Sequence, residues 1–407
     1  MATGPKTIAV LGTLDSKGEE HAYVAGLIAE AGFPTLLIDV GSGGPPTVMP
    51  DVTREEVAAA GCVDLAPMLK RKDRGECVTA MSKAAPKLVA KLAEEGKIHG
   101  IISLGGGGGT AIATAAMRGL PVGFPKVMVS TLASGNTAHY LGTKDVTMIP
   151  SIVDVSGLNQ ISKVIFQRAA GAICGMANVD AKQDAEDRPL IAASMFGNTT
   201  ECVDAARGIL EDAGYEVLIF HATGAGGRTM ETLIADSLIS AVLDVTTTEW
   251  ADELCGGTLS AGATRLDAAG KTGIPAIIAP GCLDMANFGA RETVPGQFDG
   301  RNFYVHNPQV TLMRTTPEEC ARLGKILAEK ANAYTGPVSV LLPTRAISII
   351  SAEGQPFHDP VADKALFDAI KANLSPDLEL IEMDLEINAP EFSEACARTL
   401  LKHLDRT

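Results

Sequence analysis

Short apolar runs rich in β-branched residues alternate along the first half of the chain with stretches in which apolar residues return every three or four positions. The runs cover residues 7–12, 35–41, 99–105 and 126–131. Continuous apolar runs between helical stretches are typical of parallel strands that are buried on both faces. The pattern therefore predicts a doubly wound, mainly parallel, Rossmann-like α/β domain.

A polar, acid-rich segment that ends in proline separates this half from the next, and we place a linker there at residues 181–189. The first domain is then residues 1–180 and the second is residues 190–407. Residues 8–44 and 191–227 share the order strand, turn, helix, Ala-Gly-aromatic corner, strand and closing GxGG. We interpret this likeness as an internal duplication that gives two α/β lobes facing a cleft, although independent βαβ units would produce the same order.

Two helices of the second domain are predicted from their first residues. A capping threonine, a proline and two acids begin a helix that we expect over residues 317–332. A similar start, with aspartate and proline, predicts a helix within residues 358–374.

Composition and charge narrow the classes of function. The formal net charge is −15 and no basic run is present, which argues against nucleic-acid binding. The eight cysteines show no CxxC pair and no zinc-site spacing, so we expect reduced thiols. We find no signal peptide and no apolar stretch of the ~18–20 residues that span a bilayer, and therefore expect a cytoplasmic protein without membrane contact.

Five consecutive glycines stand between a predicted strand and a predicted helix. Glycine loses more backbone freedom on folding than any other residue, so such a run is costly as a mere connection. A helix N-terminus that a ligand can approach without meeting side chains is suited to phosphate. We predict a phosphate-binding loop, with a tight packing turn as the alternative, made of Gly105, Gly106, Gly107, Gly108, Gly109 and Thr110. NAD is disfavoured because the loop matches neither the P-loop nor the dinucleotide fingerprint.

Two further loops after strands are rich in small polar residues. In the first, Thr13, Asp15 and Lys17 could contact ribose, phosphate or a metal, or else Asp15 is simply the N-cap of a helix and Lys17 a solvated residue. The second loop offers a dense row of donors suited to a nucleotide or a carboxylate: Ser130, Thr131, Ser134, Gly135 and Asn136.

The second domain places reactive side chains after its strands. Cys282 could be a nucleophile if a helix N-terminus lowers the pKa of its thiol, with His221 or His306 as the base. Arg345 could clamp a carboxylate or phosphate. The alternatives are a buried thiol, structural histidines and a surface ion pair.

Three acids of the second domain are candidate magnesium ligands. Glu249, Asp252 and Glu253 lie at helical spacing and could hold Mg²⁺ together with the phosphates of a nucleotide. The alternative is a solvated helix face.

Several strings resemble one family over nearly the whole chain: GTLDSKGEE, SLGGGGGT, VSTLASGNTAHYLGTKD, VTTTEWADELCGG and PGCLDMANFG. They are similar to the bacterial UPF0261 proteins, which are relatives of the inhibitory domain of the tomato mosaic virus resistance protein Tm-1. The resemblance implies a Tm-1-like ATP-binding domain, a second α/β domain and a homodimer. It implies ATP contacts from Gly12 and from the residues of the three loops named above.

These observations lead to one hypothesis and two alternatives. We expect an ATP-dependent enzyme that acts on a small carboxylated metabolite in the cleft between the domains. A non-catalytic nucleotide sensor is the first alternative. The second is a cofactor-independent lyase, isomerase or hydrolase whose glycine loops hold a substrate phosphate or carboxylate.

Overall fold

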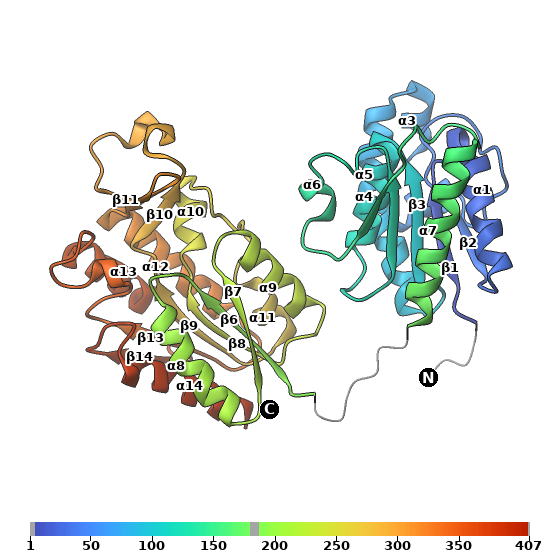
Figure 1. The fold of residues 1–407 in the computed structure, drawn as a ribbon. Coiled ribbons are helices and arrows are strands. Elements are labelled where there is room, and N and C mark those ends of the chain that lie inside the picture. Colours follow the sequence, from blue (N-terminus) through green and yellow to red (C-terminus); the bar gives the residue numbers. More distant parts are fainter. Residues whose placement is uncertain (1–4, 180–186, 406–407) are drawn as a thin grey trace. The chain divides into compact units, whose positions relative to one another are not determined.

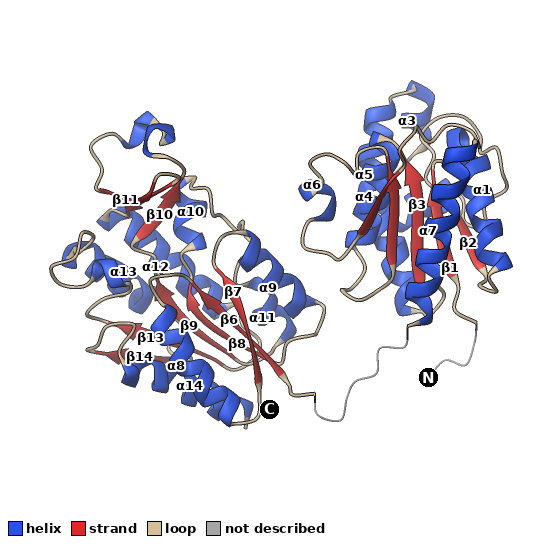
Figure 2. Ribbon diagram, in the orientation of Figure 1, coloured by secondary structure: helices blue, strands red, loops and turns tan. Residues whose placement is uncertain are grey.

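The computed structural model describes residues 5–179 and 187–405, and residues 181–186 of the expected linker lie outside that part (Figure 1). The chain divides into two compact units, residues 1–183 and 184–407, and each is described by itself. Each unit contains a parallel sheet with helices on both faces (Figure 2). The prediction of two Rossmann-like α/β domains is confirmed.

The first unit is built on a five-stranded parallel sheet with the order β2-β1-β3-β4-β5. Its strands are β1 (Ile8–Gly12), β2 (Thr35–Asp39), β3 (Gly100–Gly105), β4 (Lys126–Ser130) and β5 (Thr147–Pro150). Its helices are α1 (Leu14–Glu30), α2 (Arg54–Ala60), α3 (Ala66–Arg71), α4 (Arg74–Glu94), α5 (Gly107–Arg118), α6 (Ala138–Leu141) and α7 (Gln160–Asn178).

Two hydrophobic cores lie on opposite faces of this sheet. On one face, α1 and α7 contribute Val24 and Phe166 to a core with Val10 of β1. On the other, α4 and α5 pack Met81 and Ile112 against the sheet. Every residue of β3 is buried, which explains its unbroken apolar sequence.

The second unit has a six-stranded parallel sheet with the order β14-β13-β9-β8-β6-β7 and a separate antiparallel sheet with the order β10-β12-β11. The parallel strands are β6 (Leu190–Met195), β7 (Glu216–His221), β8 (Ala241–Thr246), β9 (Ala276–Gly281), β13 (Val338–Pro343) and β14 (Glu379–Met383). The antiparallel strands, inserted between β9 and α12, are β10 (Met285–Phe288), β11 (Phe303–Asn307) and β12 (Val310–Arg314).

Helices cover both faces of the second parallel sheet (Figure 2). They are α8 (Thr200–Asp212), α9 (Ala225–Ala235), α10 (Glu249–Cys255), α11 (Asp267–Thr272), α12 (Pro317–Asn332), α13 (Pro360–Asn373) and α14 (Pro390–Leu404), with short 3-10 helices at Arg291–Thr293, Gly296–Phe298 and Ile349–Ser351. Among the described residues, none of the helices combines the length and the apolar character needed to cross a bilayer.

Both parallel sheets begin with the same strand order. In each unit the first strand lies between the second and the third, and the fourth and fifth follow on the side of the third. The second strand is therefore added on one side of the first strand, and all later strands are added on the other side. Ligands of open α/β sheets bind beyond the carboxyl ends of the strands at such a switch point. The shared order agrees with the interpretation of an internal duplication.

Candidate functional site

The loops that follow β1, β3 and β4 meet at the switch point of the first sheet. β1 pairs with β3, and β3 pairs with β4. The loops after β3 and β4 are joined by hydrogen bonds: the Thr131 N–H donates to Gly105 O at 3.2 Å, and the hydroxyls of Thr110 and Ser130 lie 2.7 Å apart. Three stretches that are separate in sequence thus come together at the carboxyl ends of neighbouring strands.

The glycines of the loop after β3 have different surroundings. A Cβ on Gly105 would lie 3.2 Å from Gly109 Cα, so these two residues pack closely. A Cβ on Gly107 would meet no atom within 4 Å, and one on Gly108 would lie 3.6 Å from Arg74 Nη2. Gly105 therefore serves packing, whereas Gly107 borders open space.

The N-terminus of α5 is unusually bare. Gly106 is its N-cap and offers no side chain to the first turn, and that turn, residues 107–110, contains no acid. The first N–H groups of a helix have no acceptor within the helix, and they form the positive end of its dipole. This end of α5 is suited to an anion.

Side chains of the loop after β1 tie neighbouring loops together. Asp15 Oδ2 accepts a hydrogen bond from Gly43 N at 2.6 Å, while its Oδ1 is buried with no partner among the described residues. Lys17 donates to Val155 O. Thr13 holds the N-cap position and is buried. Asp15 is therefore not the N-cap and Lys17 is not merely solvated, so both alternative interpretations are wrong.

His21 lies beneath this loop and explains Gly12. A Cβ on Gly12 would be 2.2 Å from His21 Nε2. The His21 ring is fully buried, with Nδ1 2.7 Å from Lys17 O, and Leu104 N donates to Nε2 at 3.4 Å. Burial lowers the pKa of His21, so the neutral imidazole bridges α1 and β3. Sequence reasoning missed His21, because nothing in the sequence marks it as buried.

A cavity of about 650 Å³ opens beside the loops that follow β1 and β2, and its lining is partly basic. Lys17, Lys72 and Arg74 line it together with Thr13, Asp15, Ser16, Ser42, Gly43, Gly44 and Leu69. Arg74 is the first residue of α4, and Asp73 caps that helix. Sequence reasoning missed Lys72 and Arg74, because both are remote in sequence from the loops that were singled out, and only the fold places Arg74 beside Gly108.

Residues of the loop after β4 make local hydrogen bonds and also line a cavity. Ser130 is buried, and its Oγ accepts from Leu132 N at 3.0 Å. Asn136 accepts from Ala138 N within a local turn, next to the exposed Gly135. Thr131 and Ser134 line a cavity of about 330 Å³ with residues 150–154. Ser130 also borders this cavity, so three of the predicted donors of this loop contribute to it.

The structure does not support the nucleophile predicted in the second domain. Cys282 is completely buried, and burial with the nearby Asp284 raises the pKa of its thiol well above the ordinary value. His221 is exposed at the end of β7, three strands from β9, which corresponds to about 14 Å at the usual strand spacing. Cys282 is therefore a buried neutral thiol, and His221 is too far away to act as its base.

The other two predicted catalytic residues are exposed on different elements. His306 lies on β11 of the antiparallel sheet, with its ring centroid 6.4 Å from that of Tyr304. Arg345 follows β13 and forms two 3.0 Å hydrogen bonds with the exposed Asp384. The structure does not bring the four predicted catalytic residues into one site.

The predicted magnesium ligands belong to separate networks. Glu249 accepts from Arg265 Nε at 2.7 Å and from Gly224 N at 2.6 Å. Asp252 accepts from the side chain and the backbone of Asn287. Over residues 5–179 and 187–405, no group of three or more His, Cys, Asp or Glu residues could hold a metal ion. Glu249 and Asp252 are therefore engaged in separate hydrogen-bond networks, and the structure does not gather the predicted acids into one cluster.

Two family models match this chain, and they divide it close to the boundary between its two compact units. The model of the uncharacterised protein family (UPF0261) N-terminal domain matches residues 6–182, and that of its C-terminal domain matches residues 188–404. A UPF0261 protein of Clostridium tetani is 49% identical over 98% of this chain and 100% of its own, and one of Rhizobium meliloti is 46% identical over 96% and 97%.

A plant protein is also related. The ToMV resistance protein Tm-1 of Solanum lycopersicum is 39% identical over 81% of this chain, which corresponds to 45% of the plant protein. Among solved structures, the glycosyltransferase SnogD of Streptomyces nogalater aligns over 98% of this chain and 100% of its own, with 9% identity and a TM-score of 0.18, a likeness too weak for comparison. On the two family models and these relatives, the chain belongs to the UPF0261 family.

Proposed function

We propose that the first domain binds the phosphates of a nucleotide, with ATP as the first candidate. The observation that carries this proposal is the bare N-terminus of α5 at the switch point, where Gly107 borders open space. Backbone N–H groups at such a helix end bind phosphate in many α/β proteins. The absence of an acid in the first turn leaves that end positive.

The neighbouring cavity supports the same ligand. Its volume of about 650 Å³ lies within the usual range for small-molecule sites. The guanidinium of Arg74 lies beside Gly108, where a phosphate bound to α5 would be within its reach. Lys17 and Lys72 add positive charge in a protein whose net charge is −15. The choice of ATP among nucleotides rests on the family resemblance, and Mg²⁺ would accompany its phosphates.

The first test compares two substitutions at one position. Gly107 has space for a side chain, so both Gly107→Ala and Gly107→Asp should fold. The aspartate puts a negative charge where the phosphate would lie, and we expect calorimetry with Mg·ATP to show at least about a tenfold loss of affinity, equal to ~1.4 kcal/mol. The alanine variant should bind nearly as well as wild type.

Arg74→Ala provides an independent test. Loss of a charged hydrogen bond to phosphate should weaken ATP binding by about 10-fold or more. Arg168→Ala, which removes an exposed arginine of α7, is the matched control and should bind normally. If the wild-type protein does not bind ATP at all, the proposal is wrong.

We further propose that the bound nucleotide serves an ATP-dependent enzyme acting on a small carboxylated metabolite. Its test is ADP release in the presence of a panel of carboxylic acids, which should rise above the basal rate with at least one of them. Tight ATP binding without turnover would instead favour a nucleotide sensor. Loss of metabolite binding in Gly107→Asp, with no ATP binding in wild type, would favour a cofactor-independent enzyme.

The homodimer stays a prediction that rests on the family resemblance. Sedimentation equilibrium of the full chain should give twice the chain mass of 42.2 kDa. A mass of one chain at micromolar concentration would contradict it.

A further inference from the structure

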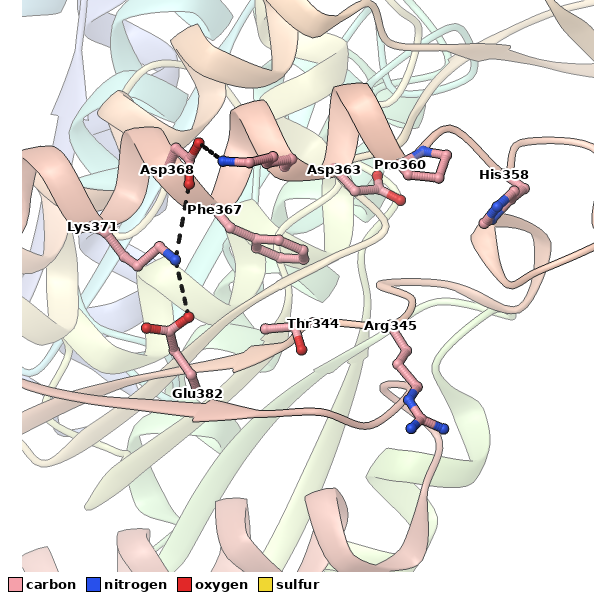
Figure 3. Close-up of a pocket in the computed structure, with 10 residues that line it drawn as sticks. Thr344, Arg345, His358, Pro360, Asp363, Phe367, Asp368, Lys371 and Glu382 are labelled. Atoms are coloured by element: carbon pink, nitrogen blue, oxygen red, sulfur yellow. Dashed lines mark hydrogen bonds and ion pairs between the residues drawn. The ribbon is translucent and has the colours of Figure 1, made fainter.

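A cavity of the second domain lies at the ends of β13 and β14, against α13 (Figure 3). Its volume is about 390 Å³, within the range of small-molecule sites. Thr344 and Arg345 follow β13, Glu382 belongs to β14, and the other lining residues belong to α13 or the loop before it. The carboxyl ends of parallel strands are where α/β domains bind ligands.

Asp363 is the most buried charged residue that lines this cavity, and one of its two carboxylate oxygens accepts no hydrogen bond from a described residue. Asp363 is 6% exposed, and its Oδ1 accepts from Arg314 Nη2 at 2.6 Å. No described residue donates a hydrogen bond to Oδ2 of Asp363. Oδ2 is not fully shielded from solvent, and Asp363 lines the cavity, so a ligand there can reach this oxygen. A ligand that donates a hydrogen bond to this oxygen would therefore be stabilised.

Asp363 shares its counter-ion with a second acid. Arg314 also faces Asp284, which is fully buried and accepts from Ser348 Oγ at 2.8 Å. Oδ1 of Asp284 has no partner among the described residues. Two carboxyl groups thus lie near one guanidinium, and burial raises the pKa of both, that of Asp363 to about 6. Above that pH the carboxyl group of Asp363 is negative.

The charges at the rim, by contrast, are already paired. Lys364 bonds to Asp368, and Lys371 lies 3.1 Å from Glu382. Arg345 is held by Asp384. The floor between the rim and Asp363 is the ring of Phe367, which lines the cavity although it is 6% exposed. Figure 3 shows Asp363, Phe367 and Thr344 around the same space.

We propose that this cavity binds a small primary ammonium ion, which donates to Oδ2 of Asp363 and rests its carbon atoms on the ring of Phe367. A cation is favoured because Oδ2 of Asp363 can only accept a hydrogen bond once the carboxyl group is ionised, and the ring of Phe367 offers an apolar surface to the carbon atoms. A primary ammonium is favoured over a quaternary one because only the former has an N–H to donate. The site belongs to the second domain and does not depend on nucleotide binding in the first.

The test uses the full chain and three probes, n-butylammonium, the matched neutral 1-butanol and tetramethylammonium, whose binding is followed by saturation-transfer NMR at pH 7.5. We expect saturable binding of n-butylammonium and at least about tenfold weaker binding of butanol and of tetramethylammonium. Asp363→Asn should lose the preference for the ammonium, whereas Asp368→Asn, which removes a rim acid, should keep it. Equal binding of the two butyl probes, or no saturable ammonium binding, would overturn the proposal.

Wild type offers a second readout that needs no substitution, because Asp363→Asn also removes the partner of Arg314. Protonation of Asp363 should weaken n-butylammonium binding by about tenfold between pH 7 and pH 5, given the pKa of about 6. The other charged groups that face Asp363 are Arg314, Asp284 and Asp359, with His358 at the rim. His358→Asn should retain the pH dependence, and affinity that does not change with pH would contradict the assignment.

Discussion

Single side chains hold the ends of strands at both switch points. In the first domain the His21 ring fills the space that a Cβ of Gly12 would need. In the second domain Arg265 is 1% exposed and lies 2.5 Å from Asp244 and 2.7 Å from Glu249. Neither residue could be chosen from the sequence, because each depends on partners brought together only by the folded chain.

The fit of His21 leads to a prediction for Gly12. Gly12→Ala should destabilise the protein by about 1–3 kcal/mol, the range for overpacking, because the methyl group would overlap the buried imidazole. Urea unfolding would measure this change. Gly26→Ala is the matched control in α1, where a Cβ meets no atom within 4 Å, and it should be neutral or stabilising. An unchanged midpoint for Gly12→Ala would contradict the steric explanation.

The Arg265 network leads to a second prediction. Arg265→Met should cost about 3–5 kcal/mol of unfolding free energy, because Asp244 and Glu249 would remain buried without their counter-ion. Arg398→Met, which breaks an exposed pair with Glu394, should leave the stability nearly unchanged. A similar loss of unfolding free energy in both variants would show that burial of the network does not cause the effect of Arg265→Met.

At the scale of elements, the parallel strands and the capped helices were predictable. β3 is buried on both faces and is therefore an unbroken apolar run. α12 begins at Pro317 and ends at Asn332, as predicted, because Thr316 and Glu319 form a capping box. The antiparallel sheet was not predicted, since its strands are short and partly polar. The basic side of the nucleotide cavity was missed for a different reason, because Arg74 begins a helix that is remote in sequence.

The contact between α10 and β10 leads to a prediction about pH. Burial raises the pKa of Asp252 from 3.8 to about 7, although hydrogen bonds from Asn287 oppose the shift. The folded state thus keeps a proton that the unfolded state has released, so the unfolding free energy falls as the pH rises from about 4 to about 7, by at most ~4 kcal/mol from this group.

Asp252→Asn should remove this part of the pH dependence. Asn287 Oδ1 has no partner among the described residues and could accept from the new amide. Denaturant unfolding at pH 4.5 and pH 7.5 would show a smaller stability difference in the variant than in wild type. Asp368→Asn, on the exposed face of α13, should keep the wild-type difference, and an equal loss there would contradict the role of Asp252.

At the scale of the whole molecule, the two domains have separate hydrophobic cores, and neither parallel sheet shares a strand with the other. Residues 1–180 should therefore fold alone, unfold cooperatively and bind ATP with the affinity of the full chain. Circular dichroism and calorimetry on this fragment would test it. A fragment that folds but does not bind ATP would show that the nucleotide site needs the second domain.

The antiparallel insert has an evolutionary consequence. It leaves the parallel sheet after Gly281 and returns before Pro317, so its removal would not interrupt any parallel strand pairing. Yet its last strand supplies Arg314, the counter-ion of Asp363. In a lineage that lost the insert, Asp363 would remain buried without its counter-ion. Homologues with a shortened insert are therefore expected to have replaced the aspartate at position 363 by a neutral residue, so that the two features are gained or lost together.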